Sequence, residues 1–293
     1  MLKGIYPPLT TPFRNDDIDC THFIANIKKY NKFDLSGYVV LGSNGESVFL
    51  SKEEKIKLIE TVREHMLSGK CLIAGTGQES TKETIGLSNE ASNAGAEYSL
   101  IKTPSFFKNN MNNKAMVEYF TNVADSIKIP VIIYNVTKFT NVNISLETVI
   151  KLSEHPNIIG IKNSSENIAE LNAMIHNTNK KFSTLIGTGS VLLPALISGA
   201  TGGVLALANI APKDCLKIYD LYKEGNLNDA QIIQNRLLAV NKAITATYGI
   251  AGLKTAMGLL GYYGGRPRKP LQPLSANKVK ELKLILQRAK LLK

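Results

Sequence analysis

The sequence predicts an α/β protein, a (β/α)8 TIM barrel followed by a C-terminal helical extension. First, short β-branched apolar runs alternate with longer segments of helical period over roughly the first 210 residues. Second, these runs are apolar throughout, which is typical of parallel strands covered on both faces. Third, only helical segments follow residue 208. We therefore expect a barrel over residues 1–210 and a helical extension over residues 211–293, packed on the barrel.

The apolar runs are the expected strands, and each is bounded by turn or helix-capping residues. Eight β-α units in about 210 residues fit the size of a (β/α)8 barrel. The expected strands cover residues 4–9, 37–41, 71–75, 98–101, 131–134, 158–162, 183–186 and 203–206.

Helical segments separate these runs, and two of them begin with a capping box. Ser51 stands three residues before Glu54, and Ser80 stands three residues before Glu83. The expected helices of the barrel cover residues 21–32, 51–67, 80–93, 112–126, 146–153, 166–177 and 191–198. Those of the extension cover residues 213–223, 228–248, 251–260 and 277–292.

A doubly wound open sheet is the competing fold for this alternation of strands and helices. Such a fold more often carries a glycine-rich dinucleotide fingerprint after its first strand. Residues 7–12 instead read Pro-Pro-Leu-Thr-Thr-Pro. This segment favours the barrel.

The charge balance argues against a nucleic-acid binder. The net charge is +11, from 35 basic and 24 acidic residues, and the lysines are densest over residues 277–293. No aromatic side chains are interleaved with them for stacking on bases. We interpret the lysines as the solvated faces of helices.

Other sequence features indicate a cytoplasmic protein without metal or cofactor. No apolar run is long enough to span a membrane, and the amino terminus does not resemble a signal peptide. The three cysteines are far apart, and the four histidines show no metal-binding spacing. We therefore expect no disulfide, no metal site, no membrane partner and a reducing cytoplasm.

Lys162 ends an apolar run that begins at residue 157. Desolvation at the end of a buried strand disfavours the ammonium form of a lysine and lowers its pKa. A neutral amine can attack a carbonyl and form a Schiff base. The ordinary alternative is a lysine whose side chain simply extends into solvent.

Two further strand ends carry residues that suit the same chemistry, because catalytic groups of a (β/α)8 barrel lie at the carboxyl ends of its strands. Residues 42–46 read Gly-Ser-Asn-Gly-Glu, and their backbone N–H groups with Ser43 and Asn44 can bind a carboxylate. Tyr134 ends another strand and can move protons near Lys162. The ordinary alternatives are a plain turn and a tyrosine that only satisfies its hydroxyl.

Taken together, residues 42–46, 134–136, 160–162 and 202–204 resemble the dihydrodipicolinate synthase/N-acetylneuraminate lyase superfamily of class I pyruvate aldolases. The resemblance extends over nearly the whole chain. It implies a (β/α)8 barrel, a small-molecule 2-oxo acid substrate, no cofactor and a homotetramer.

The resemblance also implies roles for individual residues. Lys162 would form the Schiff base, Tyr134 would shuttle protons, and Ser43 would join that relay. Ser43 and Asn44 would hold the substrate carboxylate. The substrate-binding residues implied in total are Ser43, Asn44, Gly45, Gly187 and Val204.

Within the family, the chain is most similar to 4-hydroxy-2-oxoglutarate aldolase. The Ser-Asn pair at residues 43–44 and the segments 248–254, 261–265 and 270–272 carry this similarity. We expect a lyase that cleaves 4-hydroxy-2-oxoglutarate or a 2-keto-3-deoxy sugar acid and releases pyruvate or a similar 2-oxo acid. The alternatives are 4-hydroxy-tetrahydrodipicolinate (dihydrodipicolinate) synthase, N-acetylneuraminate lyase, and a non-catalytic barrel that binds 2-oxo acids.

Three phenylalanines depart from the family pattern. Phe139 stands where dihydrodipicolinate synthases have an arginine that binds the second substrate. Phe106 and Phe107 stand where the family tends to carry a relay tyrosine. These departures argue against the synthase and leave the aldehyde-side substrate open.

Overall fold

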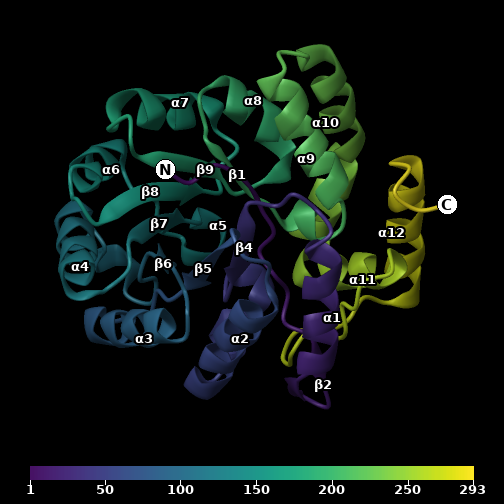
Figure 1. Ribbon diagram of the computed structural model, residues 1–293, viewed down its shortest axis with the longest axis horizontal. Coiled ribbons are helices and arrows are strands. Elements are labelled where there is room, and N and C mark those ends of the chain that lie inside the picture. Colours follow the sequence, from purple (N-terminus) through teal and green to yellow (C-terminus); the bar gives the residue numbers. More distant parts are fainter.

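The computed structural model describes residues 1–293 and has a barrel of eight parallel strands at its centre (Figure 1). The strand order is β1-β10-β9-β8-β7-β6-β5-β4, and a parallel bridge between Pro8 and Val39 joins its two ends. The strands are β1 (Gly4–Tyr6), β4 (Gly37–Val40), β5 (Cys71–Gly75), β6 (Tyr98–Lys102), β7 (Val131–Asn135), β8 (Ile158–Asn163), β9 (Ser183–Ile186) and β10 (Gly202–Val204). The predicted (β/α)8 barrel is confirmed.

The first strand is shorter than predicted, because it ends at Tyr6 instead of residue 9. Pro7 and Pro8 have no backbone N–H to donate to a neighbouring strand. The segment still closes the barrel through other groups. The N–H of Val39 donates to the carbonyl of Pro7, and the N–H of Leu9 donates to the carbonyl of Val39.

Helices surround the strands, as Figure 1 shows. Ser51 forms the complete capping box with Glu54. The side chain of Ser80 accepts from the N–H of Glu83, but the second bond of a capping box, from the N–H of Ser80 to the Glu83 carboxylate, is absent. The helices of the barrel are α1 (Cys20–Tyr30), α2 (Lys52–His65), α3 (Thr81–Asn93), α4 (Asn113–Ser126), α6 (Leu146–Ser153), α7 (Ile168–Asn177) and α8 (Leu192–Ile197).

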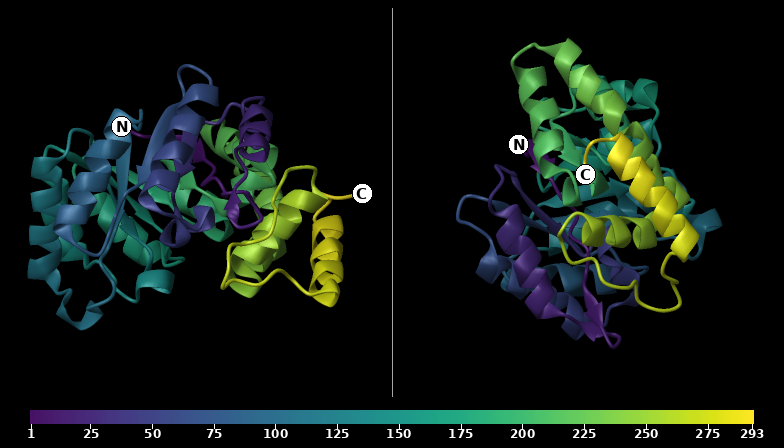
Figure 2. Two further views of the ribbon diagram at one scale, coloured as in Figure 1. Left: turned by 90° about the horizontal axis from the view of Figure 1, so that it is seen from below. Right: turned by 90° about the vertical axis from the view of Figure 1, so that its right-hand side faces the viewer.

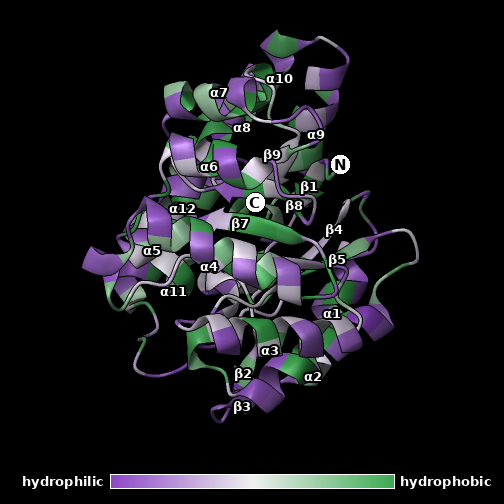
Figure 3. Cartoon of the chain, turned by 90° about the vertical axis from the view of Figure 1, so that its left-hand side faces the viewer, coloured by the Kyte–Doolittle hydropathy of each residue, from purple (hydrophilic) through white to green (hydrophobic).

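Alternate strand residues face the interior of the barrel and form a small core of their own. Figure 3 shows β7 in green, whereas the helices over it mix green and purple. On β7 the residues of this inner core are Ile132 and Tyr134. Tyr134 lies opposite Lys102 of β6 and Lys162 of β8 in the strand register. The apolar filling of the barrel therefore ends in a layer that carries two amines and a phenol.

The C-terminal extension consists of α9 (Pro212–Lys223), α10 (Leu227–Lys242), α11 (Gly249–Leu259) and α12 (Ala276–Arg288). It lies on one side of the barrel, next to α1 (Figure 2). One hydrophobic core contains side chains of both parts, including Leu58 and Leu72 of the barrel and Leu237 and Leu286 of the extension. The division between residues 210 and 211 stays a prediction.

The structure corrects the predicted helix over residues 228–248. That segment is α10 followed by a π-helical turn, η6 (Ala243–Thr247). Thr245 donates its hydroxyl to the carbonyl of Asn241, and Lys138 donates to the carbonyl of Thr245. These two bonds compete with regular helical pairing at this point.

Three short elements were not predicted: the strands β2 (Phe13–Arg14) and β3 (Asp17–Ile18), which form a hairpin, and a single turn of helix, α5 (Thr137–Thr140). All three are too short to give a periodic pattern. None of the helices combines the length and apolar composition that a membrane crossing requires.

Candidate active site

Lys162 and Tyr134 lie side by side at the carboxyl ends of β8 and β7. The two residues are in register across the strands, and Lys162 Nζ is 3.9 Å from the centroid of the Tyr134 ring. Lys162 is only 3% exposed, so the alternative that its side chain simply extends into solvent is wrong. The structure thus brings together the amine and the phenol that the sequence singled out.

The hydroxyl of Tyr134 is the centre of a polar group of side chains. It lies 3.2 Å from Ser43 Oγ. Burial alone would raise the pKa of Tyr134, but the charge of Lys162 and hydrogen bonds from Ser43, Lys162 and Ser164 outweigh it and lower that pKa. A phenol that ionises more easily than usual suits proton transfer near neutral pH.

Residues 42–46 follow β4, and we call them the carboxylate loop after the role that the sequence predicts for them. Backbone hydrogen bonds within the loop give it its shape. Its middle is a 3₁₀ turn, η1 (Ser43–Gly45), and Gly45 N–H donates to the carbonyl of Gly42. The hydroxyl of Thr11 donates to the carbonyl of Gly45 at 2.7 Å. Ser43 and Asn44 are half-buried on this turn. Ser43 is thereby held against Tyr134, and the substrate-binding role of this loop stays a prediction.

A side chain at Gly45 would approach the carbonyl of Leu9 to 3.1 Å, so glycine lets the loop pack closely against the barrel. Val204 is buried in the same inner core as Tyr134. Gly187 packs against Ser164. If residue 187 had a side chain, its Cβ would lie 2.1 Å from Ser164 Oγ, which is too close. Gly187 therefore makes room for Ser164.

Ser164 is the residue of this site that sequence reasoning missed. Its N–H donates to the carbonyl of Asn135 at 3.0 Å, and its hydroxyl is one of the groups that lower the pKa of Tyr134. A signal existed in the sequence. Ser164 stands two residues after Lys162, and side chains two apart on a strand share a face.

The three phenylalanines are exposed on the single chain. Phe106, Phe107 and Phe139 are 79%, 70% and 61% exposed, and the first two pack edge to face with centroids 5.0 Å apart. Phenylalanine has no hydroxyl, so none of the three side chains can hydrogen-bond to Tyr134. Within one chain, the hydroxyl groups near Tyr134 are those of Ser43 and Ser164.

The segment before Phe106 is tied down by Glu79. Its carboxylate accepts from the N–H groups of Ser105 and Phe106 at 2.7 and 2.9 Å and pairs with Lys102 at 2.7 Å. These interactions outweigh its desolvation and lower the pKa of Glu79 to about 2. The carboxylate is thus ionised and holds the start of this loop at all ordinary pH values.

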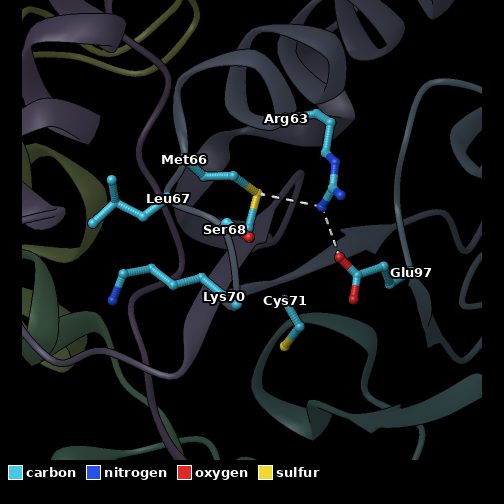
Figure 4. Close-up of a pocket in the computed structure, with 8 residues that line it drawn as sticks. Arg63, Met66, Leu67, Ser68, Lys70, Cys71 and Glu97 are labelled. Carbon is cyan, nitrogen blue, oxygen red and sulfur yellow. Dashed lines mark hydrogen bonds and ion pairs between the residues drawn. The ribbon is translucent and has the colours of Figure 1, made fainter.

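A separate pocket lies at the opposite end of the barrel, where β5 begins. Figure 4 shows Arg63 and Glu97 on one of its walls, joined by an ion pair of 2.8 Å. Its volume is about 500 Å³. It is lined by Arg63, Met66, Leu67, Ser68, Gly69, Lys70, Cys71 and Glu97. Since Lys162 stands at the other end of the strands, this pocket is not part of the candidate site.

Curated relatives of the chain include both synthases and an aldolase. A 4-hydroxy-tetrahydrodipicolinate synthase of Methanothrix thermoacetophila is 35% identical over 98% of this chain and 96% of its own length. A probable mitochondrial 4-hydroxy-2-oxoglutarate aldolase of Emericella nidulans is 34% identical over 97% of this chain and 93% of its own. Five further relatives, each 32 or 33% identical to this chain, are also 4-hydroxy-tetrahydrodipicolinate synthases.

Solved structures agree with this grouping. Dihydrodipicolinate synthase from Aquifex aeolicus superposes with a TM-score of 0.94 at 30% identity, over 99% of both chains. The E. coli prophage protein YagE, determined in complex with pyruvate, has a TM-score of 0.94 at 29% identity, also over 99% of both chains. The model of the dihydrodipicolinate synthetase family matches residues 1–289. The chain therefore belongs to the dihydrodipicolinate synthetase family.

Proposed function

We propose that this protein is a class I, Schiff-base enzyme in which Lys162 forms an imine with a pyruvate-type 2-oxo acid. The observation that carries this proposal is the group of Lys162, Tyr134 and Ser43 at the ends of three strands, in which the amine and the phenol are buried. A buried amine 3.9 Å from a phenol ring has little freedom and a proton-transfer partner beside it. A barrel that only binds 2-oxo acids would not need that phenol.

The chemistry follows from these groups. The amine of Lys162 attacks the keto carbon, and the proton that the nitrogen loses goes to the former keto oxygen, which becomes the hydroxyl of the carbinolamine. Tyr134 protonates that hydroxyl, which leaves as water, and the imine forms. In cleavage, the protonated imine accepts the electron pair of the breaking C3–C4 bond and becomes an enamine, while the Tyr134 phenolate takes the proton of the C4 hydroxyl and an aldehyde leaves. In condensation, the imine loses a C3 proton to the Tyr134 phenolate and becomes an enamine. The enamine supplies the electron pair of the new bond to the aldehyde carbon, and the aldehyde oxygen takes that proton.

The carboxylate loop supplies the other half of the proposal. Hydroxyl, amide and backbone N–H groups of Ser43 and Asn44 are donors of the kind that a carboxylate accepts. Ser43 also contacts Tyr134 at 3.2 Å. A carboxylate held there would bring the adjacent keto carbon toward Lys162. Pyruvate bound by the related YagE protein supports this substrate class.

For the second substrate, the comparisons favour the synthase over the aldolase that the sequence predicted. We therefore infer condensation of pyruvate with aspartate semialdehyde as the leading reaction. Cleavage of 4-hydroxy-2-oxoglutarate is the second candidate. It is supported by Phe139 in place of the arginine and by the aldolase among the relatives.

The decisive test is borohydride trapping with pyruvate, followed by peptide mapping. We expect an adduct on Lys162 and none on Lys254, the other fully buried lysine. Lys162→Arg keeps the charge and should abolish the adduct. An unmodified Lys162 in the wild-type protein would refute the proposal.

A substrate panel then separates the reactions. Condensation with aspartate semialdehyde identifies the synthase. Cleavage of 4-hydroxy-2-oxoglutarate, 2-keto-3-deoxygluconate or N-acetylneuraminate identifies the corresponding lyase. Trapping of pyruvate without turnover of any of them would indicate a binding protein.

The proposal includes assembly into a homotetramer and a cytoplasmic location, both taken from the family resemblance and the sequence. The exposed pair Phe106 and Phe107 supports assembly, because two large apolar side chains on one loop are costly to leave in water.

A further inference from the structure

A buried ion pair joins the last residue of the carboxylate loop to the C-terminal extension. Glu46, the last residue of that loop, contacts Lys254 of α11 with Oε1 and Nζ 2.5 Å apart, and both side chains are 1% exposed. Glu46 has the left-handed backbone conformation, with φ of 56°. A non-glycine residue in that conformation needs surrounding contacts to hold it.

The partners of Glu46 come from the end of the chain. Its Oε2 accepts from the backbone N–H of Arg268 at 2.8 Å, and Lys254 donates to the carbonyl of Arg266 at 3.0 Å. The guanidinium of Arg268 makes two hydrogen bonds to Glu54, of 2.6 and 2.7 Å, just beyond the loop. The loop is therefore held at one end by side chains and backbone of the C-terminal extension.

Arg266 and Arg268 belong to residues 261–268, a segment that follows α11, is itself fixed on α1, and is called the strap here. The side chain of Asn26 exchanges two hydrogen bonds with the backbone of Tyr263, of 2.8 and 2.9 Å. Tyr262 stacks on Tyr30 with centroids 5.0 Å apart. A side chain at Gly264 would collide with the carbonyl of Lys254 at 1.9 Å. The strap thus has one well-defined position.

We propose that Glu46 and Lys254 are positioning residues, through which the strap sets the shape of the carboxylate loop and hence the affinity for the 2-oxo acid. The inference rests on the proposed function, in which Ser43 and Asn44 hold the substrate carboxylate. The side-chain partners of Glu46 are Lys254 and the backbone of Arg268, and no hydrogen bond or ion pair joins it to Lys162. Glu46 acts by fixing the backbone that follows Gly45.

The competing explanation is that the pair contributes only to stability. Removing one partner leaves an uncompensated buried charge, which is strongly destabilising, so the single variants Glu46→Gln and Lys254→Met can fail to fold. Replacing both partners by apolar residues of similar size is often neutral or stabilising. The double variant Glu46→Leu with Lys254→Leu is therefore the informative one.

The experiment titrates pyruvate against borohydride trapping at Lys162. For the folded double variant we expect the half-saturating pyruvate concentration to rise at least about tenfold, because small misplacements of a binding group have large effects. The amount of adduct at saturating pyruvate should stay within about twofold of wild type, because the geometry of Lys162 and Tyr134 is unchanged.

Arg236→Met is the matched control, since it removes a half-buried ion pair with Asp214 inside the extension, away from the loop. It should lower the melting temperature and leave the half-saturating concentration unchanged. A double variant with wild-type affinity would overturn the inference while the proposed function stands. A wild-type protein that traps no pyruvate would instead refute the proposed function, and the inference with it.

Discussion

At the scale of single residues, the site depends on how one phenol is surrounded. Tyr134 is buried, which by itself favours its neutral form, yet Lys162, Ser43 and Ser164 together lower its pKa. The buried amine thus makes the buried phenol easier to ionise, because a neighbouring positive charge favours the phenolate. Tyr134 would not have this property alone at the end of an ordinary strand.

The first prediction concerns the pH dependence of catalysis. In the proposed mechanism Tyr134 must be protonated to release water from the carbinolamine, so the rate should fall as pH rises through its pKa, which lies below the ordinary value of 10.0. Ser43→Ala removes one of the hydrogen bonds that lower this pKa, so the alkaline fall should move to higher pH. The measurement is kcat against pH for both proteins.

Tyr38→Phe is the control for that measurement, because Tyr38 is another buried tyrosine, with its hydroxyl bonded to Asn31 outside the site. Its pH profile should match wild type. An alkaline limb that stays in place in Ser43→Ala would contradict the assignment of Tyr134.

A second prediction concerns the proton shuttle itself. Tyr134→Phe removes the hydroxyl and leaves the ring that packs on Lys162, so the fold should persist. Loss of a positioned acid–base group typically costs 10²–10⁴-fold, and we expect kcat to fall by about 10²-fold or more. Steady-state kinetics test this, with the thermal stability of the variant as a check on folding.

At the scale of elements, the loops at the carboxyl ends of the strands are held by charged side chains. Glu79 ties the loop after β6 to the barrel, just as Glu46 ties the loop after β4 to the strap. Both carboxylates accept hydrogen bonds from backbone N–H groups. Such bonds hold the backbone itself in place, whereas a bond to a side chain would hold only that side chain. Long loops on a rigid barrel thereby gain defined positions.

A third prediction follows for the loop after β6. The lowered pKa of Glu79 means that its anchoring is complete above about pH 4.5 and is lost as the pH falls toward 2. Glu79→Gln should loosen the loop already at neutral pH, with backbone amides of residues 103–112 exchanging about threefold to tenfold faster. Hydrogen exchange measured by mass spectrometry tests this.

Glu97→Gln serves as its control, because Glu97 forms a comparable half-exposed ion pair with Arg63 at the other end of the barrel. Exchange over residues 103–112 should be unchanged in that variant. Equal exchange in Glu79→Gln and wild type would show that the loop needs no anchor.

The strands and long helices could be predicted because their patterns are local. The end of β1 also had a local signal, in Pro7 and Pro8, whereas the break after α10 had none. The break depends on Lys138, which bonds to the carbonyl of Thr245 from a distant turn. The same distinction holds in the site. Lys162 and Tyr134 are recognisable because they end predicted strands. The role of Glu46 depends on its ion pair with Lys254, and no local sequence pattern connects these two residues.

At the scale of the whole molecule, the fourth prediction is the assembly. Light scattering should give four times the chain mass of 32.0 kDa. Replacing Phe106 and Phe107 together by serine should reduce the mass. Leu67→Ser, at an exposed position on the opposite end of the barrel, should not. A wild-type protein with the mass of one chain would contradict the prediction.

The hydrogen bond between Glu46 and Arg268 joins residues 222 positions apart, and this separation affects the order in which parts of the site form during synthesis. During synthesis the barrel strands leave the ribosome well before the strap. The loop after β4 therefore lacks its final anchor until residue 268 has emerged. High affinity for the proposed 2-oxo acid should consequently arise only after residue 268 has emerged, so that a chain shortened before this residue competes poorly for substrate.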